Sequence, residues 1–158
     1  MNKKTVIIYA SMHHGNTIKL VKGISEQYNI TLIDATKEKK ADLRKYEIIG
    51  FASGIDFGKF YDVIENFARD NLPVNKKVFF LYTCAMERKG FTDSMSKIVL
   101  DKEASILGEY GCKGYNTYGP WKLIGGMNKN HPTRDEVMSA VAFFENLYLD
   151  ESDERKDI

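Results

Sequence analysis

The segment after the first apolar run gathers groups that bind anions: hydroxyls, an amide and two imidazoles beside a glycine. Its residues are Ser11, Met12, His13, His14, Gly15, Asn16 and Thr17. The segment opens an expected helix, and helix N-termini carry unpaired backbone N–H groups that favour anions. It has neither the three glycines of a dinucleotide fingerprint nor the Gly-Lys-Ser/Thr of a Walker loop. We therefore expect a site for a single phosphate group, with helix capping by Ser11 and Asn16 as the alternative.

The two adjacent histidines add further donors to this segment. An imidazole N–H can donate to a phosphate oxygen, and histidine is the side chain that most readily gains a proton near neutral pH. We expect either His13 or His14 to contact the phosphate. The alternative is that one ring points into solvent and has no role.

The apolar pattern predicts the elements that position this segment. Continuous apolar runs at residues 5–9, 30–33, 48–52 and 78–82 are typical of buried strands, and alternation over 105–115 indicates a fifth. Helical spacing follows four of these runs; the residues on the apolar faces are Thr17, Leu20, Val21, Ile24 and Tyr28, then Phe60, Val63, Ile64, Phe67 and Ala68, then Phe91, Met95, Ile98 and Val99, and last Val137, Ala140, Val141, Phe144 and Tyr148. Thr133 and Glu136 form a capping box before the last helix.

Strands that alternate with helices predict an α/β fold, a doubly wound three-layer α/β/α sandwich with a five-stranded parallel sheet. In such sheets ligands bind beyond the carboxyl ends of the strands, where the winding direction switches. Two further loops should meet the first one there: Ser53, Gly54, Ile55, Asp56 and Phe57 after the third strand, and Thr83, Cys84 and Ala85 after the fourth. Gly54 and Gly58 would let a ligand approach the backbone closely.

Composition narrows the class of protein. The 158 residues carry 23 Lys and Arg against 22 Asp and Glu, a net charge of +1 that favours neither nucleic acid nor an anionic membrane. Two cysteines are too few for a disulfide scaffold, and the basic start has no cleavage site for a signal peptide. We expect a cytoplasmic protein with one domain, residues 1–149, and a polar tail, residues 150–158.

The motif Ser11 to Thr17 resembles the phosphate loop of the flavodoxins, whose usual form is Ser/Thr-x-Thr-Gly-x-Thr, and the resemblance covers nearly the whole chain. It implies the strand order 2-1-3-4-5 and bound FMN, with the flavin ring gripped by the loops after the third and fourth strands. A backbone group near Gly54, Ile55 or Asp56 would contact ring atom N5. The chain departs from the pattern by one extra residue after Ser11, and His14 stands where a threonine is usual.

Other side chains near the expected site allow two interpretations each. Phe57 either stacks on the flavin or packs beneath the next helix, whereas Cys84 is interpreted as a structural thiol. Tyr115 is expected to close the sheet, and Trp121 to lie on a rim for a partner protein. Four cations are expected to make that rim basic: Lys59, Arg88, Lys89 and Lys122.

We expect an electron carrier that shuttles electrons between redox partner proteins and acts as a monomer or weak dimer. No nucleophile and base are placed together by the sequence, which favours a carrier over an enzyme. The alternative is an NAD(P)H-dependent FMN or quinone reductase on the same fold. A receiver module is set aside because residues 9–15 contain no acidic pair.

Overall fold

The computed structural model describes residues 3–153 and contains a sheet with the predicted topology. Its parallel strands are β1 (Thr5–Ala10), β2 (Thr31–Asp34), β3 (Ile48–Asp56), β5 (Lys77–Cys84) and β6 (Ser105–Lys113). They lie in the order β2-β1-β3-β5-β6, and a short strand, β4 (Lys59–Phe60), pairs antiparallel with β3. The parallel strands thus follow the predicted order 2-1-3-4-5, which confirms the fold class. The winding direction switches between β1 and β3.

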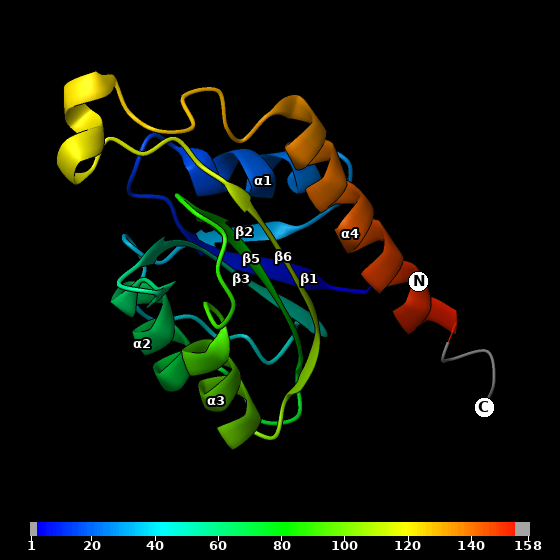
Figure 1. Cartoon of the computed structure of the whole chain (residues 1–158). Coiled ribbons are helices and arrows are strands. Elements are labelled where there is room, and N and C mark those ends of the chain that lie inside the picture. Colours follow the sequence, from blue (N-terminus) through cyan, green and yellow to red (C-terminus); the bar gives the residue numbers. More distant parts are fainter. Residues whose placement is uncertain (1–2, 154–158) are drawn as a thin grey trace.

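Helices cover both faces of the sheet and make it a three-layer sandwich (Figure 1). Helices α1 (Asn16–Ser25) and α4 (Arg134–Asp153) pack on one face, and α2 (Asp62–Asn71) and α3 (Asp93–Asp101) on the other. Successive residues of a strand point to opposite faces, so Ile7 and Phe79 enter the core under α1 and α4, whereas Ile8 and Phe80 enter the other. This two-sided burial explains why the strands read as unbroken apolar runs.

The predicted capping box forms at the start of α4. The Thr133 N–H donates to Glu136 Oε1 at 2.8 Å, and the Glu136 N–H donates to Thr133 Oγ1 at 3.2 Å. Each side chain therefore satisfies a backbone donor that the helix leaves unpaired. His131 Nδ1 also lies 2.5 Å from Glu136 Oε1, which joins the preceding loop to the cap.

The segment after the third strand differs from its prediction as a loop. Strand β3 continues to Asp56, and the chain returns as β4, so Phe60 lies in a strand and not in the following helix. Phe57 and Gly58 form the turn with φ of 50° and 78°. Positive φ at both central residues is the geometry of a tight two-residue hairpin, which matches the twist of its strands.

The ends of the last strand and of the last helix also differ from their predictions. Strand β6 ends at Lys113, two residues before the predicted end at 115. The predicted tail, residues 150–158, begins inside α4, which continues to Asp153 because Glu151 is buried against Lys3 and Lys77. Residues 154–158 lie outside the described part of the chain. In that described part, no helix combines the length and apolarity needed to cross a membrane.

Candidate functional site

A cavity of about 560 Å³ lies at the carboxyl ends of β1, β3 and β5. This volume is within the range of small-molecule sites, roughly 300–1,000 Å³. Its walls include twelve of the predicted site residues: Ser11, Met12, His13, His14, Asn16, Thr17, Gly54, Ile55, Asp56, Thr83, Cys84 and Ala85. The topology therefore brings the three predicted loops together at one place.

The other three predicted residues lie outside the cavity wall. Gly15 is the residue before α1 and has a left-handed φ of 65°. Ser53 is buried, and its Oγ donates to the Gly54 carbonyl at 2.6 Å and accepts the Tyr61 N–H at 2.9 Å. Phe57 is 92% exposed and lines a neighbouring cavity, so it does not pack beneath the following helix.

Asn16 connects the first loop to the segment after β6. Its Nδ2 donates to the Tyr115 carbonyl at 2.8 Å, and its Oδ1 accepts the Tyr115 N–H at 3.1 Å. The close approach needs Gly114, because a Cβ there would lie 2.6 Å from Asn16 Nδ2. Asn16 therefore does not cap α1. Ser11 does contribute to capping, since its Oγ accepts the Ile18 N–H at 3.2 Å.

The two predicted threonines form a buried pair across the base of the cavity. Thr17 Oγ1 and Thr83 Oγ1 are 3.0 Å apart and join the start of α1 to the end of β5. Two hydroxyls carry two hydrogens, and their mutual bond uses one. The second hydrogen has no acceptor among residues 3–153, so it can be donated to a ligand in the cavity.

The histidines face different walls. His14 Nε2 lies 2.9 Å from Thr117 Oγ1, and its ring centroid lies 4.1 Å from that of Tyr115. His13 makes an edge contact with Tyr61 at 6.1 Å between ring centroids. His14 thus joins the same segment that Asn16 binds, and a phosphate contact by either ring stays a prediction.

The backbone of the first loop has the character of an anion site. Within the described residues, the N–H groups of residues 12–15 have no hydrogen-bond acceptor. The first turn of α1 carries no acidic residue that would repel an anion. A helix N-terminus with free N–H groups and no opposing charge stabilises a phosphate.

The sequence patterns did not point to Tyr61, which forms part of the cavity wall. Its ring packs on Gly54, where a Cβ would lie 2.1 Å from the phenol oxygen. Burial, with a smaller contribution from the Asp56 charge, raises the pKa of Tyr61 to about 12. Tyr61 therefore keeps its O–H at neutral pH and can donate it to a ligand. Tyr61 reaches the cavity because the hairpin of β3 and β4 brings the chain back to Gly54. The sequence predicted a loop at these residues, so it could not indicate that Tyr61 lines the site.

Cys84 lines the cavity as an unreactive thiol. Its Sγ donates to the Cys112 carbonyl at 3.5 Å, and burial is the main cause that raises its pKa to about 11. Both cysteines are free and buried. A thiol with so high a pKa carries almost no thiolate near neutral pH, which agrees with a structural role.

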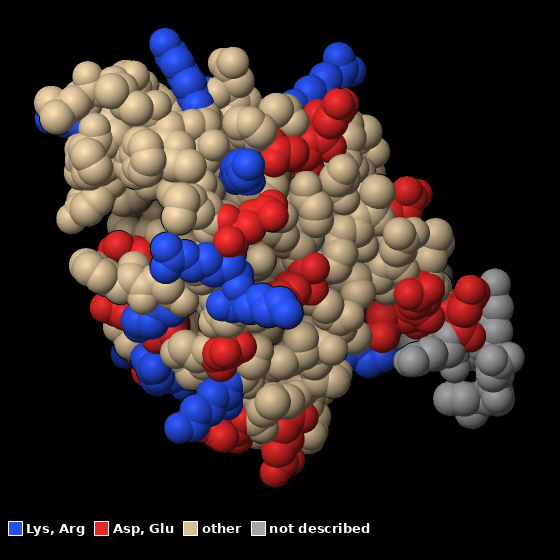
Figure 2. All heavy atoms as spheres, in the orientation of Figure 1, with Lys and Arg blue, Asp and Glu red and all other residues tan. Residues whose placement is uncertain are grey.

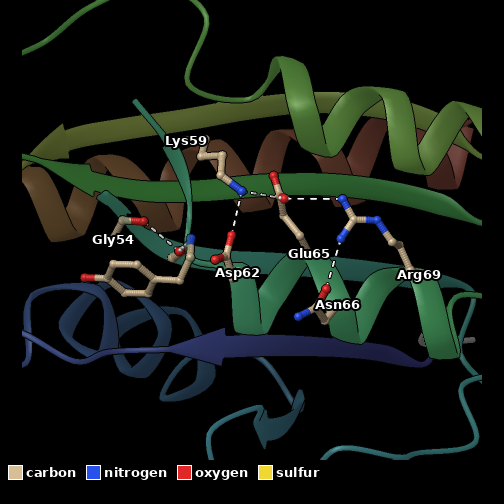
Figure 3. A network of polar contacts seen from close by, with 8 residues as sticks. Gly54, Lys59, Asp62, Glu65, Asn66 and Arg69 are labelled. Atoms are coloured by element: carbon tan, nitrogen blue, oxygen red, sulfur yellow. Dashed lines mark hydrogen bonds and ion pairs between the residues drawn. The ribbon is translucent and has the colours of Figure 1, made fainter. Parts of the chain in front are cut away.

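The expected basic rim is weaker than predicted because Lys59 is neutralised. Lys59 Nζ reaches from β4 to Asp62 Oδ1 at 2.6 Å and Glu65 Oε2 at 2.9 Å on α2 (Figure 3). Arg69 approaches the same Glu65 oxygen at 3.5 Å. Arg88 and Lys89 line a separate hollow, whereas Lys122 lines the main cavity itself.

The family model described as a flavodoxin domain matches residues 6–112. This is more than half of the chain, and the chain belongs to the flavodoxin family. An uncharacterized protein of Methanocaldococcus jannaschii is 38% identical over 146 residues, which cover 91% of this chain and 97% of that protein.

Solved structures share the fold at low sequence identity. A flavodoxin from the domain Archaea aligns with a TM-score of 0.61 at 13% identity, over 96% of this chain and 99% of that chain. A flavoprotein from Lactobacillus acidophilus, solved in complex with FMN, aligns with a TM-score of 0.52 at 18% identity, over 71% of this chain and 93% of that chain. Membership of the family implies a flavin cofactor, and the cavity has the donors and the space that a flavin requires.

Proposed function

We propose that this chain binds FMN and carries single electrons between redox partner proteins. The observation that carries the proposal is one cavity, in a chain of the flavodoxin family, with two chemically different ends. One end is the start of α1 with its free N–H groups, which suits a phosphate. The other end is formed by Gly54 and residues 83–85, where backbone can lie against a flat ring.

The site residues divide by these two ends. Residues 12–15 would hold the phosphate through backbone N–H groups, and the free hydrogen of the Thr17–Thr83 pair would add a donor beneath it. Gly54, Ile55 and Asp56 would contact one side of the ring, and Thr83, Cys84 and Ala85 the other. Bound FMN supplies the redox chemistry, because its ring accepts and releases electrons. The protein binds and orients the ring and limits access of water to it.

A carrier suits the side chains of the cavity better than a self-standing enzyme does. Among the described lining residues, Cys84 gives its S–H to a backbone carbonyl, and Tyr61 has a raised pKa. Thr117 Oγ1 lies 2.9 Å from His14 Nε2 there, but no third group among the described residues accepts a hydrogen bond from the His14 ring to orient it, as an activated nucleophile requires. Electron transfer needs only a held ring and an accessible edge, and it needs no such pair.

A specific observation favours a second candidate, an NAD(P)H-dependent FMN or quinone reductase. A second cavity of about 400 Å³ adjoins the first and shares Met12, Asp56 and Tyr61 with it. A hydride donor or a quinone could lie there next to the flavin. We rank this candidate second because the N-terminal segment offers one phosphate loop and no second nucleotide motif.

Anaerobic mixing of the FMN-loaded chain with NADH or NADPH separates the two functions. A carrier should show no repeated turnover with a quinone present, and after reduction by dithionite it should pass its electrons to cytochrome c in stoichiometric amount. Continuous oxidation of NAD(P)H over many turnovers would make the chain a reductase.

We further propose that the carrier consists of one domain, acts as a monomer or weak dimer, and works in the cytoplasm. Its buried free thiols suit a reducing compartment.

A further inference from the structure

Lys122 has no role in the contacts described above. It lies in the short 3₁₀ helix η1 (Gly119–Ile124) and lines the main cavity. Its side chain is exposed and has no ion pair or hydrogen bond with residues 3–153. Among the described residues of the cavity wall, it is the one lysine or arginine, and Asp56 is the one carboxylate.

The chain holds η1 next to the start of α1. Asn16 binds both backbone groups of Tyr115, and His14 contacts Thr117. A bridge between Asn116 and Met127 then closes the base of the segment that carries η1. Figure 1 shows η1, in yellow, beyond the end of the sheet where α1 begins. These contacts place Lys122 on the α1 side of the cavity.

Asp56 lies on a different wall, at the end of β3. Its charge acts on Tyr61, which packs on Gly54, so the carboxylate belongs to the ring end of the cavity. An anionic group is stabilised near a lysine and a helix N-terminus and destabilised near a carboxylate. Lys122 and Asp56 therefore make the two ends of the cavity electrostatically different, and the end beneath η1 favours an anion.

We propose that Lys122 binds the phosphate of the flavin and makes this site selective for FMN over riboflavin. The proposal rests on the proposed function and adds to it a cationic phosphate contact from outside the loop after β1. Asn16 is then a positioning residue, because it holds the segment that brings Lys122 to the cavity. A lysine ammonium is a point charge on a flexible stem, so Lys122 can reach a phosphate from η1.

The test compares the dissociation constants of FMN and riboflavin for the wild-type chain, Lys122→Met, Lys122→Arg and the matched control Lys129→Met. Lys129 is an exposed lysine of the same segment that does not line the cavity. Lys122→Met should weaken FMN by about tenfold, the range of one charged hydrogen bond, and riboflavin by less than about twofold. Lys122→Arg should restore most of the FMN affinity, and Lys129→Met should leave both constants unchanged.

Salt provides a second readout. Raising the salt from about 50 to about 500 mM should reduce the preference for FMN in the wild-type chain more than in Lys122→Met, because salt screens an exposed charge pair. Equal weakening of both flavins by Lys122→Met, or no weakening of either, would overturn the inference while FMN binding by the wild-type chain stands. A wild-type chain that binds neither flavin would instead overturn the proposed function and, with it, this inference.

Discussion

Asn16 uses both ends of its amide on a single backbone unit, that of Tyr115. Asn16→Ala leaves the half-buried Tyr115 carbonyl without this donor, so the free energy of unfolding should fall by about 0.5–1.5 kcal/mol. FMN affinity should also fall, because the segment that closes the cavity loses its attachment to α1. Urea unfolding and FMN titration measure the two effects. The exposed Asn130→Ala is the control, and unchanged FMN affinity in Asn16→Ala would contradict the positioning role.

The Thr17–Thr83 pair makes a prediction about coupling. Either Thr17→Val or Thr83→Val leaves one buried hydroxyl alone, which should cost about 1–3 kcal/mol of unfolding free energy. The double variant removes both hydroxyls and should cost clearly less than the sum of the two single variants. Urea unfolding of all four chains completes the cycle. Additive losses would show that the two hydroxyls do not stabilise each other.

The sequence could indicate the types of these residues but not their partners. Hydroxyls and an amide at a helix start predict donors near an anion, and the cavity does collect them. The partner of Asn16 lies 99 residues further along the chain, and no local spacing encodes such a contact. Capping and ligand binding use the same residue types, which is why both interpretations of Ser11 and Asn16 stayed open until the fold was known.

At the scale of elements, the hairpin of β3 and β4 is fixed to α2 by charge. Glu65 is buried, and Lys59 supplies the shorter of its two ion pairs (Figure 3). Lys59→Met should lower the free energy of unfolding by about 1–2 kcal/mol, because the buried carboxylate keeps only Arg69. Amide hydrogen exchange should become faster in residues 55–60. Lys40→Met, at an exposed lysine, is the control, and unaltered exchange in the hairpin would show that packing alone holds it.

The capping box of α4 predicts a dependence of stability on pH. Burial opposes ionisation of Glu136, but the Thr133 N–H and His131 outweigh it, so its pKa lies below the ordinary value of 4.5. A carboxyl group whose pKa is lowered by folding stabilises the protein above its unfolded pKa and loses this contribution as the pH falls through the folded value. Below pH 4.5, the wild-type chain should therefore lose stability more steeply than Glu136→Gln.

Urea unfolding at pH values from 7 to 3 measures this difference. Glu38→Gln, at an exposed glutamate, should follow the wild-type curve. Parallel curves for the wild-type chain and Glu136→Gln would mean that the cap contributes no pH-dependent stability.

The prediction of elements from sequence succeeded where periodicity was strong. Strands buried on both faces read as apolar runs, and the helices showed one apolar stripe each, so their order was predicted correctly. The hairpin at residues 55–60 was missed because Gly54 and Gly58 are typical of loops, and a two-residue turn with Phe57 at positive φ is unusual for a bulky side chain. The end of α4 was missed because Glu151 is polar, and a polar residue predicts a solvent-exposed tail. In the structure Glu151 is buried and forms ion pairs with Lys3 and Lys77.

At the scale of the whole molecule, cations and anions are interspersed on the face drawn in Figure 2, while the surface over the 3₁₀ helix η1 on that face is mostly uncharged. Tyr118, Leu123 and Ile124 are exposed there, next to the cavity. The net charge of +1 predicted that neither positive nor negative charge would dominate the surface. Composition carries no information on where exposed apolar residues lie, so it could not predict this apolar surface. That location depends on the contacts of Asn16 and His14, which tie residues 114–127 to the opposite end of the sequence.

The central claim is that the cavity at the ends of β1, β3 and β5 is an FMN site. The most direct test is a titration of FMN with the purified, flavin-free chain, followed by flavin fluorescence and visible absorbance. The account predicts saturable quenching with one FMN per chain, together with a shifted and structured absorbance band that marks a ring held out of water. The contradicting result is flavin fluorescence and absorbance that stay identical to those of free FMN when the correctly folded chain is present in large excess.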